Sequence, residues 1–163
     1  MHGFAPGLLD KLLMGNRQTA SNDVVVRLSM EELKDSVARD LESLLNTRKV
    51  ISDELFKSYP ECSKSIATYG LNDFAGLSLS STDDRAFICR SLEKTIARHE
   101  PRLQNVIASL EVQEGSVNKL NFAISALLVV HPAQEPVSFD AVLQPSSLHY
   151  SISKTRRNTR IEL

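Results

Sequence analysis

Apolar residues recur every three or four positions along the first hundred residues, and at every second position after residue 101. The first spacing is typical of amphipathic helices, and the second is typical of strands that bury one face. The spacing changes at residues 99–103, where a glutamate and an arginine flank a proline. The pattern therefore predicts an α+β fold in which N-terminal helices pack on a small antiparallel β-meander.

The clearest predicted helix begins after Ser29. Ser29 and Glu32 have the spacing of a capping box, in which each side chain bonds to the backbone amide of the other residue. The apolar residues that follow lie on one stripe of a helix: Leu33, Val37, Leu41, Leu44 and Leu45. Arg48 and Lys49 fall where the helix is expected to end, and their positive charges suit the helix dipole.

The other side of this helix is polar. It carries Arg39, Asp40, Asn46, Thr47 and Arg48. These side chains either face solvent or contact a neighbouring protein, and the pattern alone leaves both interpretations open.

A short amphipathic helix is predicted within residues 1–15, ended by Gly15 and followed by a polar linker at 16–23. Such a helix can cap the core of its own domain or dock on a partner. The leucines on its apolar side do not distinguish the two.

The third predicted helix begins near Ser81 or Thr82 and ends at about His99, because the residue before a proline disfavours helical backbone. Its buried stripe is expected to be Phe87, Ile88, Leu92 and Ile96, with Cys89 packed beside it. Between the two long helices we expect a loop with short helical turns near Leu55 and at 61–69.

Three strands are predicted after residue 101. Apolar and polar residues alternate near 106–112, 120–130 and 137–143, with turn residues between them. The second strand is apolar on both faces towards its end, as expected of a central strand. The connection at 114–118 contains Gly and Asn, which favour a hairpin turn.

The length of 163 residues is typical of one domain. Within it we predict an N-terminal helix and linker at 1–28, an α+β core at 29–144 and a basic C-terminal segment at 145–163. The last segment has four basic residues and one acidic residue, so its net charge is +3. It can steer onto an acidic partner or lie solvated as a frayed terminus.

The composition argues for a cytoplasmic protein. The net charge of −1 gives no field that would attract nucleic acid. Cys62 and Cys89 lie far apart, which favours a reducing compartment over a disulfide framework. No stretch has the pattern of an export signal or of a membrane span.

Enzymatic chemistry is not predicted. The four histidines are scattered and the six glycines fit no phosphate-binding loop, so no metal or cofactor is expected. Glycoside hydrolysis needs only two carboxylates, and the candidates are Glu100, Glu111, Glu114 and Asp140. The chain has no Trp to hold a sugar, however, and Arg102 beside Glu100 favours a charged carboxylate, which is the wrong form for a general acid.

Ordered motifs then point to a family. The run at 34–48 resembles the SV-RDLE-LLNTR signature of the TssE family, the baseplate subunits of type VI secretion systems. Residues 69–73 resemble the YGLPD turn of that family, with Asn72 where proline is usual.

The remaining motifs follow in the same order. Residues 100–103 match the EPR motif that this family shares with the wedge protein of contractile phage baseplates. Residues 122–124 and 137–140 match its strand signatures, so the resemblance covers about 8–143. Four ordered motifs at compatible spacing make it specific.

The resemblance implies a structural protein of the cytoplasmic baseplate, docked at the inner membrane complex. Such a protein would link wedge subunits to contractile sheath subunits and nucleate sheath assembly, with no nucleic acid or small-molecule substrate. It also implies that an edge strand is offered to a sheath linker. Two alternatives stay open, a lysozyme-like peptidoglycan hydrolase and a regulatory adaptor on the same fold.

The predicted partner-binding residues are Glu100, Pro101, Arg102, Leu103, Arg39, Asp40 and Arg48. Glu100 and Arg102 are two apart, so in extended backbone their side chains would project on the same side. Arg102 can then bind a carboxylate bidentately, either on a partner or on Glu100 itself as a clasp between helix and sheet.

Overall fold

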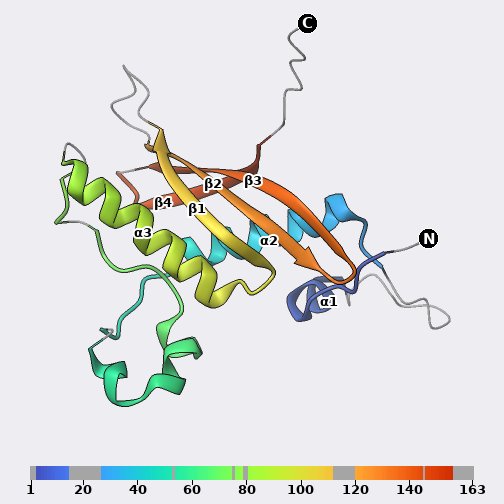
Figure 1. Cartoon of the computed structure of the whole chain (residues 1–163), viewed down its shortest axis with the longest axis horizontal. Helices are drawn as coiled ribbons and strands as arrows, with labels where there is room; N and C mark the ends of the chain where they lie inside the picture. The colour runs from blue at the N-terminus through green and yellow to red at the C-terminus, as the bar shows by residue number, and fades with distance from the viewer. Residues whose placement is uncertain are drawn as a thin grey trace, which may run out of the picture.

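The computed structural model describes residues 3–14, 27–52, 54–74, 76–78, 81–111, 120–144 and 146–155. The α-helices of this part are α1 (Leu8–Met14), α2 (Met30–Asn46) and α3 (Thr82–His99). Between α2 and α3 lie the 3-10 helices η1 (Leu55–Ser58), η2 (Pro60–Lys64) and η3 (Ile66–Thr68). Figure 1 shows these short helices protruding away from the sheet.

The strands form an antiparallel meander in the order β1-β2-β3-β4. They are β1 (Leu103–Glu111), β2 (Leu120–Val130), β3 (Ala133–Gln144) and β4 (His149–Lys154). The predicted α+β class is confirmed, and β2 is a central strand as expected. The prediction of only three strands is wrong, because β4 lies in the stretch that was assigned to the basic C-terminal segment. This strand is short and has only Tyr150 and Ile152 as alternating apolar residues, so its pattern is weak.

One face of the sheet packs on the helices to form the core. The buried residues of the sheet include Phe122, Ile124, Phe139 and Ala141, and they share one hydrophobic cluster with the stripes of α2 and α3. The intervening strand residues point to the opposite face and are more exposed, with Ile107 at 63%. This alternation is the one that the sequence predicts for a sheet with a single buried face.

The two long helices agree with their predicted limits within one or two residues. Ser29 caps α2, and the capping box with Glu32 is confirmed. Arg48 and Lys49 lie beyond the end of α2, however, because Thr47 is already in extended backbone as the C-cap. The positive charge of Arg48 still lies at the C-terminal end of the helix as predicted, because its Nη1 donates to Leu45 O in the last turn at 3.0 Å.

Phe87 does not belong to the buried stripe of α3. Ile88, Leu92 and Ile96 occupy the face that packs on the sheet, and Phe87 is 47% exposed. It is one residue out of phase with that stripe, which is about 100° around the helix. Phe87 instead meets Phe74 edge to face, with ring centroids 6.5 Å apart.

Side chains of α2 bond to the outer edge of β4. Glu42 Oε2 accepts a hydrogen bond from Ile152 N at 2.9 Å, and Asn46 Oδ1 accepts one from Tyr150 N at 2.8 Å. Asn46 Nδ2 also donates to the carbonyl oxygen of Tyr150 at 2.9 Å. Glu42 and Asn46 are one helical turn apart, so their side chains can hydrogen-bond to alternate residues of the strand.

The outer edge of β1 is bonded by α3 in a similar way. Glu93 Oε1 accepts a hydrogen bond from Ala108 N at 2.8 Å. A strand added to either edge would have to displace these helix side chains before it could form its own ladder. The open edge expected from the resemblance is therefore wrong at these positions of β1 and β4.

Gly70 joins the loop after η3 to the end of α2. Its φ of +111° is a backbone conformation that L side chains rarely adopt. The next residue, Leu71, donates its N–H to Thr47 O and accepts from Lys49 N, both at 2.8 Å. The 69–73 motif and the end of the 34–48 motif are thus one structural unit.

Several predictions fall outside the described residues: the linker at 16–23, the hairpin connection at 114–118, and the chain after residue 155. Cys62 is exposed, and Cys89 is half-buried, with burial raising the pKa of its thiol. Within the described ranges, no helix is both long and apolar enough to cross a membrane.

Candidate functional site

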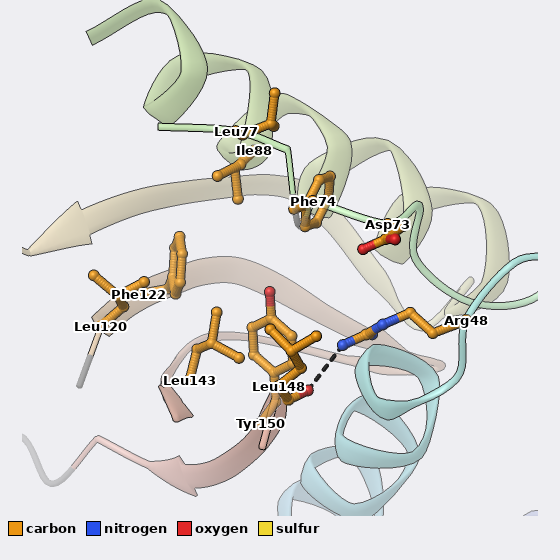
Figure 2. A pocket seen from close by; sticks show the side chains of 10 residues that line it. All are labelled: Arg48, Asp73, Phe74, Leu77, Ile88, Leu120, Phe122, Leu143, Leu148 and Tyr150. Atoms are coloured by element: carbon orange, nitrogen blue, oxygen red, sulfur yellow. Dashed lines mark hydrogen bonds between the residues drawn. The ribbon is translucent and has the colours of Figure 1, made fainter. Parts of the chain in front are cut away.

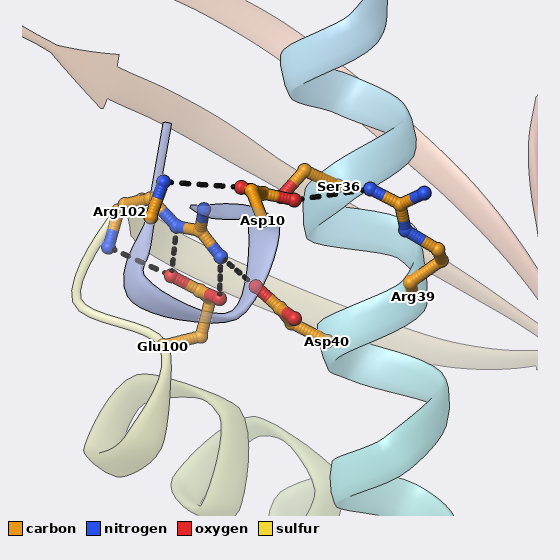
Figure 3. A network of polar contacts seen from close by, with 7 residues as sticks. Asp10, Ser36, Arg39, Asp40, Glu100 and Arg102 are labelled. Atoms are coloured by element: carbon orange, nitrogen blue, oxygen red, sulfur yellow. Dashed lines mark hydrogen bonds and ion pairs between the residues drawn. The ribbon is translucent and has the colours of Figure 1, made fainter. Parts of the chain in front are cut away.

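The residues predicted to form the site do not all lie in one place. Arg48 lines a pocket between β-strand ends and the loop after η3 (Figure 2). Glu100, Arg102 and Asp40 are brought together at the junction of α3, β1 and α2 (Figure 3). The group at this junction contains more of the predicted residues than the pocket beside Arg48.

The turn after α3 brings Glu100 and Arg102 together. The backbone N–H of Glu100 donates to Ile96 O at 2.8 Å, which makes Glu100 the C-cap of α3. Leu103 N then donates back to Glu100 O at 3.1 Å, so residues 100–103 form a tight turn. The two side chains therefore meet because the backbone turns between them. The extended backbone that the spacing of two residues had suggested is not present.

Glu100 and Arg102 form a bidentate ion pair. Arg102 Nε donates to Glu100 Oε1 at 2.7 Å, and Nη2 donates to Oε2 at 2.6 Å. Arg102 Nη2 also bonds to Asp40 of α2, so one guanidinium joins two carboxylates (Figure 3). Glu100 is only 5% exposed, and hydrogen bonding to its carboxylate raises the pKa of Arg102 further above the ordinary arginine value. We call Glu100, Arg102 and Asp40 the clasp.

A second polar cluster ties α1 to α2 beside the clasp. Asp10 is 5% exposed, and it accepts hydrogen bonds from Ser36 Oγ at 2.8 and 3.0 Å. Arg39 Nη2 donates to Asp10 Oδ1 at 3.0 Å, and Gly7 N donates to Oδ2 at 3.1 Å. A buried carboxylate needs such partners, so Asp10 is satisfied only when α1 lies against α2.

A pocket of about 380 Å³ lies between α1 and the clasp. It is lined by Gly7, Leu8, Asp10, Asp40, Ser43, Leu44, Tyr69, His99, Glu100, Pro101 and Arg102. The 99–103 stretch therefore forms one wall of a surface depression, and the N-terminal helix forms the opposite wall.

His99 and Tyr69 make another part of this wall. Their rings meet edge to face with centroids 5.4 Å apart. His99 Nε2 lies 3.0 Å from Thr68 O, and since a carbonyl only accepts, this nitrogen carries the proton. Burial lowers the pKa of His99, and burial together with the charges of Asp40 and Glu100 raises the pKa of Tyr69.

The lowered pKa of His99 predicts a loss of stability on acidification. Because the folded state protonates this ring less readily than the unfolded chain does, the free energy of unfolding falls as the pH drops below about 6.5. The variant His99→Gln keeps a donor for Thr68 O but cannot titrate. Urea unfolding at pH 7.5 and 5.5 should show a smaller difference for the variant than for the wild type, and equal differences would contradict this role.

The other predicted residues have distinct environments. Arg39 belongs to the Asp10 cluster, with its own side chain 60% exposed. Pro101 is exposed at the pocket wall, whereas Leu103 is 3% exposed and lies in the core. Arg48 is not part of this cluster, because it bonds to the carbonyl oxygens of Leu45 and Leu148 at 3.0 and 2.8 Å.

Asp10, Ser36 and Tyr69 were not predicted. The sequence did contain a sign of the role of Asp10, because this residue lies among the leucines of a short apolar helix. A carboxylate buried among apolar side chains needs a hydrogen-bonding partner. Ser36 stands among the buried residues of α2 and carried no signal of its own.

The charged side chains of this site are paired with one another. Both oxygens of Glu100 accept hydrogen bonds from Arg102, including one from its backbone N–H at 3.2 Å. Among the described residues, no three His, Cys, Asp or Glu side chains are grouped so that they could hold a metal ion. The geometry joins three helices and a strand and leaves a depression that another protein can contact.

A known protein family matches more than half of this chain. The family model described as "Baseplate wedge protein gp25" matches residues 31–133. The match spans α2, the η helices, α3, β1 and β2, and so includes Asp40, Arg48, Glu100 and Arg102. Asp10 and β4 lie outside it.

The chain is also similar to proteins named anti-adapter protein IraD. The protein of Escherichia coli O6:K15:H31, strain 536, is 30% identical over 117 residues, which are 72% of this chain and 80% of the relative. That of Escherichia coli strain SMS-3-5 is 28% identical over 127 residues, which are 77% of this chain and 96% of the relative.

Proposed function

Because the chain belongs to the family of baseplate wedge protein gp25, we propose that it is a structural subunit of a type VI secretion baseplate. In this role it links wedge subunits to the contractile sheath and nucleates sheath assembly in the cytoplasm. The family match supports the baseplate, and the motifs at 34–48, 69–73 and 100–103 support the TssE branch of it.

The observation that carries this proposal is the clasp. Asp40 comes from the 34–48 motif, and Glu100 and Arg102 come from the 100–103 motif, so the two motifs meet in one ion-paired group. Buried pairs of this kind hold their elements in one arrangement, which is what a scaffold needs at a contact point. We therefore assign the clasp the role of fixing the shape of the partner surface.

The partner surface itself is the pocket wall and the outer side of α1. Leu8 is 74% exposed and Leu12 is 68% exposed, and they lie one turn apart on α1. Leu8 and Pro101 both line the 380 Å³ pocket. Large apolar side chains rimming a depression are typical of protein contact sites, so a wedge or sheath subunit is expected to bind here.

Charged replacements of these leucines test the surface. The double variant Leu8→Glu, Leu12→Glu should fold like the wild type, because both side chains are already in solvent, but should lose co-purification with wedge and sheath subunits. Leu55→Glu is the matched control, since Leu55 is 66% exposed on η1, outside this pocket. If Leu55→Glu loses co-purification equally, or if the double variant keeps it fully, the contact with the partner lies elsewhere.

The similarity to IraD supports a second candidate, a regulatory protein that binds an adapter. An anti-adapter also acts by protein contact, so the same pocket and α1 surface could serve it. Affinity purification of the full chain from its host separates the two functions. Wedge and sheath subunits in the eluate support the baseplate, whereas an adapter protein without them supports the second candidate.

A peptidoglycan hydrolase is the third function considered. Such an enzyme needs a carboxyl group that is free to protonate the substrate, and Arg102 occupies both oxygens of Glu100. We expect the purified protein to leave a cell-wall suspension turbid, as Glu100→Gln would. Clearing by the wild type but not by Glu100→Gln would contradict the scaffold role.

A further inference from the structure

The pocket between α1 and the clasp carries more negative than positive charge. The charged residues of its lining are Asp10, Asp40, Glu100 and Arg102. His99 also lines it, but burial lowers the pKa of this ring, which is therefore neutral at pH 7. Arg39 binds Asp10 from outside the lining and balances its charge. The clasp has two carboxylates and one guanidinium, so it keeps a net charge of −1.

The unbalanced charge of the clasp lies on Asp40. Arg102 uses Nε and Nη2 to bind both oxygens of the Glu100 carboxylate, whereas it bonds to one oxygen of Asp40, Oδ2. Figure 3 shows the other oxygen of Asp40 pointing away from Arg102. Glu100 is 5% exposed, but the side chain of Asp40 is 33% exposed. Asp40 is therefore the carboxylate of the clasp that an incoming group can reach.

The field of the clasp extends over the aromatic part of the wall. The charges of Asp40 and Glu100 add to burial in raising the pKa of Tyr69, so the potential at this ring is negative. Lys49 and Arg98 act on His99, but neither of them lines the pocket. A cation over the face of a tyrosine ring is attracted by it. The ring and the carboxylate thus favour the same kind of group.

The remaining walls suit the stem of a long side chain. Leu8 and Pro101 are exposed and give the pocket apolar surface on opposite sides, one from α1 and one from the turn after α3. Lysine and arginine cover such surface with their methylene groups and keep the charged end at polar groups. The volume of about 380 Å³ leaves room for either side chain.

We propose that this pocket receives a lysine or arginine side chain of the partner protein, whose cationic group binds Asp40 while its stem packs on Leu8 and Pro101. An acidic side chain would meet the negative charge of the clasp. A purely apolar one would remove water from Asp40 without replacing its hydrogen bonds, which costs free energy. The proposed function supplies only the source of this side chain, a wedge or sheath subunit.

Two matched probes test the pocket without the partner. The full chain is titrated with N-acetyl-arginine amide and with N-acetyl-citrulline amide, which has a neutral urea group in place of the guanidinium. Both titrations are followed by the NMR signals of the backbone amides of residue 40, Ser43 and Tyr69. We expect saturable shifts with the arginine probe and an affinity about fivefold above that of the citrulline probe, as a partly exposed ion pair gives.

Two variants make the result specific. Asp40→Asn keeps an oxygen that can accept from Arg102 but removes the unbalanced charge, so the fold should persist and the preference for the arginine probe should disappear. Asp83→Asn is the matched control and should keep the preference, because Asp83 is exposed in the first turn of α3, outside the pocket.

The proposal is overturned if the arginine probe leaves these signals unshifted, if both probes bind equally, if Asp40→Asn keeps the preference, or if Asp83→Asn loses it as well. The titration contains no partner, so each of these results leaves the baseplate role standing. Conversely, a preparation from the host without wedge and sheath subunits would contradict the baseplate role and leave the selectivity of the pocket unchanged.

Discussion

Replacement of Arg102 with alanine is expected to lower the free energy of unfolding by about 3 kcal/mol. The reason is that Glu100 is 5% exposed and accepts both side-chain hydrogen bonds from Arg102, so the variant leaves a buried carboxylate without its cation. Breaking a buried pair costs about 3–5 kcal/mol, and the 25% exposure of Arg102 places this case at the lower end. Urea unfolding followed by far-UV circular dichroism measures the loss.

A paired replacement separates charge from packing. The double variant Glu100→Leu, Arg102→Met removes both charges and keeps side chains of similar size, so it should recover most of the lost stability. Asp40 then loses its partner, but its side chain is 33% exposed and can be solvated. A loss below about 1 kcal/mol in Arg102→Ala would mean that the pair serves a partner and not the fold.

Gly70→Ala is the second substitution with a large expected effect, a loss of at least about 2 kcal/mol. A Cβ atom at residue 70 would lie 2.5 Å from Thr47 O, and the φ of +111° is strained for any L side chain. Relief of this clash requires the loop to separate from Thr47, which breaks the bonds of Leu71 to the end of α2. Arg48, the next residue, would then shift as well.

Gly76→Ala is the matched control. A Cβ there would meet no atom within 4 Å, so the change in stability should stay within about 0.5 kcal/mol. Urea unfolding of the two variants side by side tests the difference. Similar losses in both would show that Gly70 owes its role to loop flexibility and not to the close approach of Thr47.

The elements with strong local patterns were predictable. The capping box of Ser29 and the stripe from Leu33 to Leu45 define α2 by local spacing alone, and the proline at 101 sets the end of α3. The alternation in β2 and β3 predicted both the buried face and the central position of β2. These features depend on residues that are close together in the chain, so a single sequence is enough to predict them.

The features that depend on distant contacts were not predictable. Tyr150 and Ile152 are too few to show the alternation of a strand, and β4 exists because it pairs with β3 and bonds to Glu42 and Asn46. The bonds from Glu93 to β1 and from Glu42 and Asn46 to β4 have the same origin. Likewise the meeting of Asp40 with Arg102 joins residues 62 positions apart, and the motif spacing gave no sign of it.

The structure also changes the meaning of the 100–103 motif. Both possibilities considered from the sequence, a clasp within the chain and a contact with a partner, use the same two side chains. The geometry shows the clasp, with Glu100 buried and Arg102 shared between two carboxylates. We propose that partner contact uses Pro101, which the clasp holds, and Leu8 and Leu12 of α1, which is held by the bonds of Asp10 to Ser36 and Arg39.

The most direct test of the baseplate role is sheath assembly in the native host. A fluorescent sheath subunit is followed by microscopy in cells that lack this chain and in cells complemented with it. The baseplate role predicts no sheaths without the chain, recovery with the wild type and with Leu55→Glu, and no recovery with Leu8→Glu, Leu12→Glu. Sheaths assembling at the normal frequency in cells that lack the chain would contradict it.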